Sequence, residues 1–170
     1  MNWQYIWNTL PRFIDATWIT LQLSFWAIVL SLFIGFFCAI VTTYKVRMLN
    51  PIVKFYIELS RNTPLLIQVF FLYFGLSKVG IKLDGFTCAV IGLAFLGGSY
   101  MSEAIRGGLE AIPRAQLESA LSLGLTPAQA FRYVLFPQAF AVAAPAIGAN
   151  SLFLMKETSV VSAIAIAELM

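Results

Sequence analysis

The 170-residue sequence contains no histidine and few charged residues, which make up only 11% of the chain. Without histidine, a Ser-His-Asp triad, a Cys-His dyad, a histidine-ligated zinc and a histidine-ligated haem are all excluded. Water-soluble domains carry about 25% charged residues. We therefore expect neither a soluble enzyme nor a catalytic or metal site in this chain.

Cysteine is also scarce, and both thiols, Cys38 and Cys88, fall in apolar stretches where a cysteine packs as a small hydrophobic residue. They predict no disulfide framework. The net charge is +3, but Lys and Arg are scattered singly among apolar residues and form no basic stripe. We expect no nucleic-acid partner.

Apolar residues, by contrast, make up 60% of the chain. Four stretches contain no charged residue: 16–44, 62–77, 85–102 and 133–155. A helix needs roughly 20 apolar residues to cross the hydrocarbon of a bilayer. The sequence therefore predicts an all-α integral membrane protein, surrounded by a lipid bilayer, with four spans and a partial fifth at about 17–43, 58–77, 85–106, 137–155 and 158–170.

Residues 1–16 precede the first span and are rich in aromatic side chains, which prefer the membrane interface. No basic region precedes the first apolar run, so we expect no cleaved signal peptide. We interpret 1–16 as an interfacial anchor, in preference to a substrate contact, and 17–170 as the transmembrane domain.

The distribution of basic residues predicts the orientation in the membrane. Seven basic residues lie in the segments after the first and third spans: Lys45, Arg47, Lys54, Arg61, Arg106, Arg114 and Arg132. Three lie in the N-terminal tail and after the second span: Arg12, Lys78 and Lys82. Cytoplasmic loops carry the excess of Lys and Arg. We therefore expect the N-terminus outside and residues 107–136, here called the elbow, in the cytoplasm.

The elbow has strong helix signals. Pro113 can open a helix, Gly124 can end it in a left-handed conformation, and Thr126-Pro127-Ala128-Gln129 has the form of a capping box with proline at N1. A second helix should end at Phe136-Pro137, where the fourth span begins. These patterns predict a helix-turn-helix, which could dock a partner or merely cap the bundle.

The same residues carry a resemblance. Glu118-Ser119-Ala120, Gly124 and Val134-Leu135-Phe136-Pro137 have the spacing of the EAA loop, E-A-A-x3-G-x9-I-x-L-P, of ABC-importer membrane subunits. Further stretches resemble the polar amino-acid uptake branch of these permeases: 61–68, 102–108, 116–118 and 156–159. Ala115 departs from the glycine usual in that branch, and members of it usually end with one more membrane helix.

The resemblance implies a type I permease bundle in a bacterial cytoplasmic (inner) membrane, which carries polar amino acids. It implies three protein partners: a second permease subunit, identical or related, cytoplasmic ATP-binding subunits, and an extracytoplasmic amino-acid-binding protein. ATP and Mg would be bound by the ATPase partner, and this chain has no phosphate-binding glycine motif of its own. The residues expected to couple to the ATPase are Glu118, Ser119, Ala120, Gly124, Thr126, Pro127, Val134 and Pro137.

A candidate substrate pathway rests on polar residues near the spans. Lys156 and Glu157 lie near the end of the fourth span, which Pro145 is expected to kink. Ionisable groups at such a place indicate a functional site or a pair that reaches the membrane surface. The resemblance favours the pathway, for which the candidates are Arg61, Glu103, Asn150, Lys156, Glu157, Thr158 and Ser159.

Two other functions stay open at this stage. A passive channel subunit would show polar rings through its spans and no docking elbow. A non-transporting assembly protein derived from a permease is compatible with the missing last helix.

Overall fold

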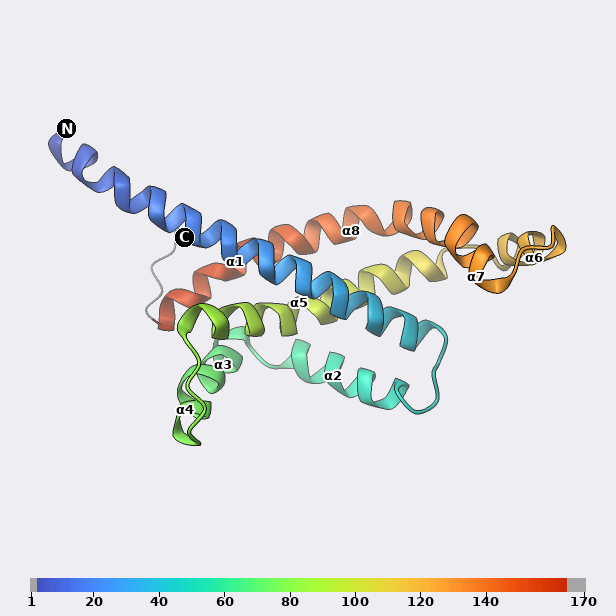
Figure 1. Ribbon diagram of the computed structural model, residues 1–170, viewed down its shortest axis with the longest axis horizontal. Coiled ribbons are helices and arrows are strands. Elements are labelled where there is room, and N and C mark those ends of the chain that lie inside the picture. The colour runs from blue at the N-terminus through green and yellow to red at the C-terminus, as the bar shows by residue number, and fades with distance from the viewer. Residues whose placement is uncertain (1–2, 165–170) are drawn as a thin grey trace.

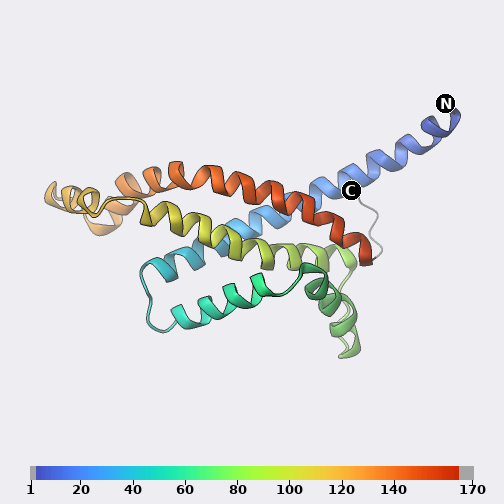
Figure 2. The same ribbon diagram turned by 180° about the vertical axis from the view of Figure 1, so that it is seen from behind.

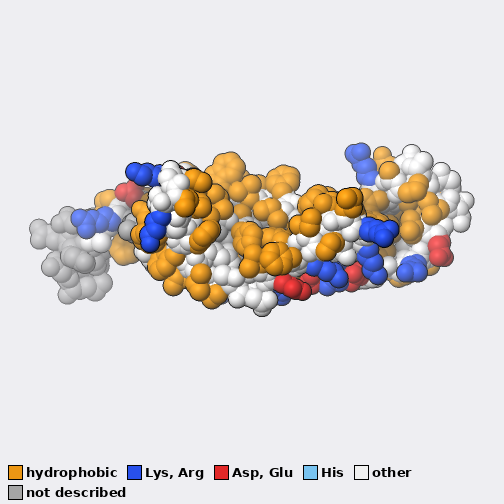
Figure 3. All heavy atoms as spheres, turned by 90° about the horizontal axis from the view of Figure 1, so that it is seen from below, with side chains coloured by type: hydrophobic (Ala, Val, Ile, Leu, Met, Phe, Trp, Pro, Cys, Tyr) orange, Lys and Arg blue, Asp and Glu red, His pale blue; other side chains and the backbone are white. Residues whose placement is uncertain are grey.

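The computed structural model describes residues 3–164, and within them the side chains of residue 7 and of residues 9–164. The described part is helical, without strands. Long helices lie along one another, the N-terminus and the α6 region are at opposite ends, and a short arm bends away from the bundle (Figure 1). Charged side chains gather near both ends of one face, with hydrophobic side chains between them (Figure 3).

Helix α1 (Trp3–Thr43) is continuous through Pro11. At about 1.5 Å per residue, its 41 residues are about 60 Å long, longer than the hydrocarbon of a bilayer is thick. Residues 3–16, predicted as a separate interfacial segment, are thus an extension of the first long helix. Trp7 and Phe13 on this extension are exposed, as an interfacial anchor requires.

The predicted second span, 58–77, is divided in the structure. Helix α2 (Asn50–Asn62) ends before Thr63, which is extended, and Pro64 precedes helix α3 (Leu65–Phe70). A proline disfavours the helical conformation for the residue before it, which favours a break at this position. The π-helical turn η1 (Phe71–Gly75) and helix α4 (Leu76–Lys78) complete the arm that bends out of the bundle (Figure 2).

Helix α5 (Gly85–Glu110) is the centre of the bundle. Its N-terminus is capped by Asp84, whose carboxylate accepts hydrogen bonds from the backbone N–H and the hydroxyl of Thr87, at 3.0 and 2.7 Å. Half of its 26 residues are buried, among them Gly97, Gly98 and Ser99. Small residues allow close approach of neighbouring helices, and α5 packs along both α1 and α8.

The last helices are α6 (Arg114–Ser122), α7 (Pro127–Ala130), the π-helical turn η2 (Phe131–Leu135), α8 (Phe136–Glu157) and the 3₁₀ segment η3 (Thr158–Ile164). The expected helix end at Phe136-Pro137 is wrong: the helix continues from Pro127 into α8. Pro137 lies at the start of α8, directly after the π turn. Proline has no backbone N–H to donate, and the changed hydrogen-bond pattern of the π turn accommodates this missing donor.

Within the described residues, three helical stretches are long and apolar enough to cross a membrane: Thr9–Thr43, Gly85–Glu110 and Pro127–Ile164. The sequence predicts four complete spans. The second predicted span accounts for the difference, because the break at Pro64 leaves only the shorter apolar stretch Leu65–Lys78. Of the expected partial span 158–170, the residues after Ile164 lie outside the described part of the chain.

Candidate functional site

Tyr100, in the middle of α5, is the point where three helices meet. The guanidinium carbon of Arg61 on α2 lies 5.0 Å from the centre of the Tyr100 ring, a cation–π contact. From α8, the Phe153 ring packs edge-on at 5.3 Å, and the Asn150 side-chain amide donates to the Tyr100 carbonyl at 3.2 Å. The structure thus brings Arg61 and Asn150, two predicted pathway residues, to one place.

Helix α2 is fixed to α5 by hydroxyl groups. Tyr56 and Ser60 both donate to the Phe95 carbonyl, at 2.7 and 2.9 Å, and the hydroxyls of Ser60 and Ser99 are 3.2 Å apart. Gly98 lies beside this contact, where an added β-carbon would be 2.6 Å from the Tyr56 hydroxyl. The position of Arg61, one residue beyond Ser60, therefore depends on these hydroxyl contacts between α2 and α5.

The break between α2 and α3 leaves backbone carbonyls without helical partners. The side-chain amide of Gln68 donates to the carbonyls of Ser60 and Thr63, at 3.0 and 2.8 Å. Unsatisfied carbonyls are costly inside a membrane, and a side chain can take the place of the missing N–H. Gln68 thus stabilises a discontinuous helix, a feature that marks substrate sites in several transporter folds.

A cavity of about 420 Å³ opens beside the Arg61 contact, between the ends of α1, α2 and α5. We call it the charged groove; its lining residues are Thr42, Lys45, Lys54, Ile57, Glu58, Glu103, Arg106 and Glu110. Arg106 pairs with the carboxylates of Glu103 and Glu110 at 2.7 and 2.6 Å. The charges of Arg61 and Glu103 are close enough to interact. Glu103, a third predicted pathway residue, therefore also belongs to the site.

Lys156, Glu157, Thr158 and Ser159 lie further along α8 and into η3. Thr158 is buried and its hydroxyl donates to the Met155 carbonyl at 2.8 Å, while Ser159 donates to the Lys156 carbonyl at 2.9 Å. Lys156 is exposed and Glu157 half-buried. In the described residues, no hydrogen bond or ion pair joins these four to the Tyr100 contacts, so the predicted pathway residues form two groups.

The predicted helix signals of the elbow are confirmed as local geometry. Gly124 has φ +82° after α6, and the Thr126 hydroxyl and Gln129 side chain form a reciprocal capping box with Pro127 at N1. Glu118 and Ser119 are exposed, whereas Ala120 is buried. The Gln138 amide donates to the Val134 carbonyl at 2.8 Å and to the Gln116 side chain at 3.4 Å, which ties α6 to the start of α8.

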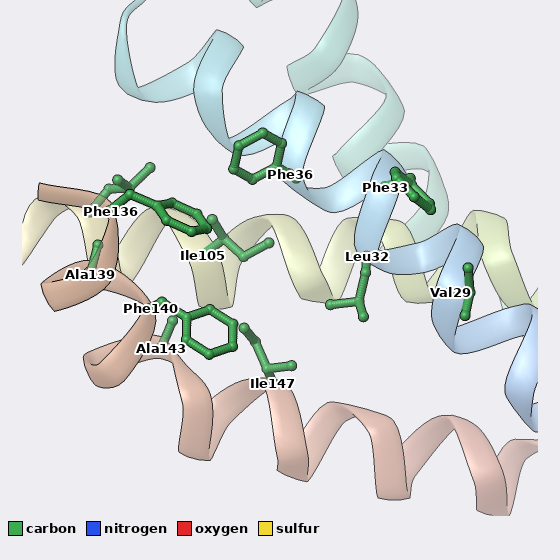
Figure 4. Close-up of a pocket in the computed structure, with 11 residues that line it drawn as sticks. Val29, Leu32, Phe33, Phe36, Ile105, Phe136, Ala139, Phe140, Ala143 and Ile147 are labelled. Atoms are coloured by element: carbon green, nitrogen blue, oxygen red, sulfur yellow. The ribbon is translucent and has the colours of Figure 1, made fainter. Parts of the chain in front are cut away.

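A second cavity, of about 410 Å³, lies between α1, α5 and α8. The rings of Phe36, Phe136 and Phe140 surround it, with Phe36 and Phe136 edge-to-face at 6.0 Å (Figure 4). Every lining side chain is apolar. A polar solute would lose its hydration there without gaining a hydrogen bond, so this cavity is no candidate for a polar substrate.

Tyr100 and Gln68 were not among the predicted functional residues. Gln68 is part of a sequence stretch with family resemblance, which could have singled it out. Tyr100 had no such signal, because its role depends on contacts 39 and 50 residues away in sequence. Within residues 3–164, no three Cys, Asp or Glu side chains lie where they could hold a metal ion together.

Comparison with known proteins agrees with the resemblance. Residues 31–170 match the family described as binding-protein-dependent transport system inner membrane component. The probable amino-acid ABC transporter permease protein PatM of Vibrio harveyi is 35% identical over 172 residues, which cover 99% of this chain and 77% of PatM. The glutamine transport system permease protein GlnP of Escherichia coli K12 is 32% identical, with 99% of this chain and 78% of GlnP covered.

Solved structures have the same fold. A crystal structure of an amino acid ABC transporter with histidines superposes with a TM-score of 0.88 at 36% identity, covering 99% of this chain and 79% of that one. An inward-facing MetNI methionine ABC transporter superposes with a TM-score of 0.79 at 20% identity, covering 95% and 78%. The chain therefore belongs to the family of inner membrane components of binding-protein-dependent transport systems, the permease subunits of ABC importers.

Proposed function

We propose that the chain is a permease subunit of an ATP-driven importer of polar amino acids. The observation that carries this proposal is the 36% identity and TM-score of 0.88 to an amino acid ABC transporter, together with relatives named as amino-acid permeases. The Tyr100 contacts add chemical support, because Arg61 offers a cation suited to a substrate carboxylate.

The proposed assembly contains two permease subunits, since one bundle of this size leaves most of α8 exposed. Ala144 and Gly148 lie on that exposed side, and small residues suit close contact with a second copy or a relative. An extracytoplasmic binding protein delivers the amino acid. The N-terminus is on that outer side of the bacterial inner membrane.

Two ATP-binding subunits dock on the elbows, and they bind ATP and Mg. Each elbow presents Glu118 and Ser119, with Ala120, Gly124, Thr126, Pro127, Val134 and Pro137 shaping its two helices. Closure of the ATPases moves the elbows and rocks the spans around the substrate, as in other alternating-access transporters. In this mechanism Lys156, Glu157, Thr158 and Ser159 contact the substrate further out along the pathway.

The experiment is uptake of radiolabelled polar amino acids by the complex reconstituted with its ATPase and binding protein. We expect uptake that requires ATP. Uptake without ATP would favour the passive channel, and an assembled complex without any uptake would favour the non-transporting assembly protein.

Within this experiment, Glu157→Gln tests the outer group of pathway residues. We expect impaired uptake with normal assembly, because the variant loses the charge that attracts the substrate amino group. Asp15→Asn, which removes the same charge from an exposed position on α1, is the matched control and should leave uptake unchanged. Normal uptake in Glu157→Gln would remove Glu157 from the pathway.

A further inference from the structure

Helices α6 and α7, here called the α6–α7 pair, lie beyond the ends of the long helices of the bundle (Figure 1). They pack on each other and on the π-helical turn η2. In the part of the chain that the structure describes, neither has comparable packing with any other helix. A movement of the pair therefore reaches the bundle through η2 and through the link 111–113, which joins α5 to α6.

The α6–α7 pair has the features of a single rigid body. Ala120 on α6 and Ala130 on α7 are both buried. Between the two helices, Gly124 with φ +82° and the reciprocal capping box of Thr126 and Gln129 fix the turn. We therefore expect the two helices to keep their relative orientation when the pair moves.

On the other side of η2, the start of α8 is fixed in the bundle. Gly108 on α5 lies against it, where an added β-carbon would be 2.8 Å from the β-carbon of Ala143 and would overlap the carbonyl of Ala139. The rings of Phe136 and of Phe36 on α1 are edge-to-face at 6.0 Å. The start of α8 therefore cannot change direction while α1 and α5 stay in place.

The turn η2 lies between these two bodies and has an irregular backbone. The N–H of Phe136 donates to the carbonyl of Phe131, five residues back instead of four. Pro137 follows directly and has no N–H to donate. Sharp bends in helices occur at π turns and at prolines, and none of the five residues of η2 is buried. The backbone between the α6–α7 pair and the bundle therefore bends most easily at η2.

One side chain supports the angle that the structure has. The amide nitrogen of Gln138 carries two hydrogens, and it donates to the Val134 carbonyl at 2.8 Å and to the side-chain oxygen of Gln116 on α6 at 3.4 Å. Both glutamines are exposed, and the bond between them is long. Water can replace this bond when it opens, so the contact supports one position of the pair without locking it.

We propose that η2 is the hinge on which the α6–α7 pair turns relative to the bundle, and that the contact between Gln116 and Gln138 holds the pair in the position seen here. This inference rests on the proposed function, in which the ATPases move the elbow, and adds to it the place where the chain bends. The α6–α7 pair and α8 keep their shapes, and the angle between them changes.

The test is a distance measurement between paired spin labels in the transporter assembled with its ATPase and binding protein, with Cys38 and Cys88 replaced by alanine. Leu123→Cys at the end of α6 and Phe37→Cys on α1 form the pair across the hinge. Leu152→Cys on α8, again with Phe37→Cys, is the control pair within the bundle. All three positions are exposed. Labelled chains are diluted with unlabelled ones, so that each transporter carries one pair of labels.

Helix α6 has 9 residues and is about 14 Å long, so a change of about 20° in the bend at η2 displaces its end by about 5 Å. A non-hydrolysable ATP analogue, which closes the ATPases, should therefore shift the distance between positions 123 and 37 by that amount. The distance between positions 152 and 37 should not shift.

Pro137→Ala locates the bend. The variant restores a backbone N–H directly after η2, which favours a regular helix there, and it should reduce the shift roughly twofold or more. Pro145→Ala is the matched control, because Pro145 lies inside the same helix α8 but beyond the hinge, and it should leave the shift intact. Gln116→Ala should broaden the distribution of distances between positions 123 and 37 before the analogue is added.

Equal shifts in both label pairs, or no shift in either pair while uptake proceeds, would overturn the hinge and leave the proposed function. A reduction by Pro145→Ala as large as that by Pro137→Ala would overturn the assignment of the bend to η2. An unchanged distribution in Gln116→Ala would overturn the role of the glutamine contact. A shift across η2 in a complex that takes up no amino acid would support the hinge and remove the proposed function.

Discussion

Gly35 on α1 lies directly against Met101 on α5, where a β-carbon on Gly35 would be 2.5 Å from that of Met101 and 2.8 Å from the backbone nitrogen of Ser102. Real β-carbons essentially never approach this closely, and a backbone nitrogen cannot move aside without moving its helix. The glycine therefore determines how close the two longest helices of the bundle lie.

Gly35→Ala should lower the stability of the chain by about 1–3 kcal/mol, the usual cost of overpacking in a tight interior. Thermal unfolding in detergent measures the effect. Gly107→Ala is the control, because an added β-carbon there meets nothing within 4 Å. A Gly35→Ala protein that unfolds at the same temperature as the Gly107→Ala protein would contradict the close contact between α1 and α5.

Gly124→Val should strain the turn of the elbow by about 1–2 kcal/mol, since φ is +82° there and a side chain disfavours that conformation. If the elbow docks the ATPase, less ATPase should co-purify with the variant and uptake should fall. Gly107→Val is matched to it, because both glycines have open space around them and only Gly124 has a positive φ. Full retention of the ATPase with normal uptake in Gly124→Val would remove the docking assignment.

Arg114 should be accessible from the cytoplasm and Lys82 from outside. The segments after the first and third spans, which include Arg114, carry seven basic residues, and the N-terminal tail and the segment after the second span, which includes Lys82, carry three. Cysteines placed at these two positions, in a protein whose Cys38 and Cys88 are replaced, should react oppositely with an impermeant thiol reagent applied to intact cells. Reaction of position 114 from outside would reverse the topology and, with it, the cytoplasmic position of the elbow.

Asp84 should make stability depend on pH at the start of α5. The hydroxyl and then the backbone N–H of Thr87 lower the pKa of its carboxyl group below the ordinary value. A lowered folded-state pKa stabilises the fold above the unfolded-state pKa, and this contribution is lost as the pH falls through the folded-state pKa. The melting temperature of the natural chain should therefore exceed that of Asp84→Asn at neutral pH, and the difference should disappear in acid. A difference that is the same at both pH values would indicate that the charge has no part in the cap.

Features determined by neighbouring residues were predictable from the sequence. The stop at Gly124 and the capping box from Thr126 to Gln129 need only local hydrogen bonds, and the structure has both. The apolar stretches likewise predicted the membrane-protein class, because the length of an apolar run can be read directly from the sequence and compared with the thickness of a bilayer.

Contacts between distant segments were not predictable in the same way. Arg61 and Asn150 were singled out for their polarity, but nothing in the sequence indicates that both contact Tyr100. The second span was expected to be continuous over 58–77, whereas the side-chain hydrogen bonds of Gln68 that stabilise the break depend on the path of the chain after Pro64. The continuous helix through Pro137 was missed because a π turn has no simple sequence signal.

The two hydrogen bonds from Gln68 also have a mechanical consequence. A continuous helix resists bending because its backbone bonds would have to break, but α2 and α3 are joined at Thr63-Pro64 by a single extended stretch and one side-chain amide. Each such bond contributes about 0.5–1.5 kcal/mol, so the joint itself resists bending far less than a continuous helix does. The direction of α3 relative to α2 is therefore determined less by the backbone than by the side chains of Leu65 and Val69, which are buried in the core of the bundle.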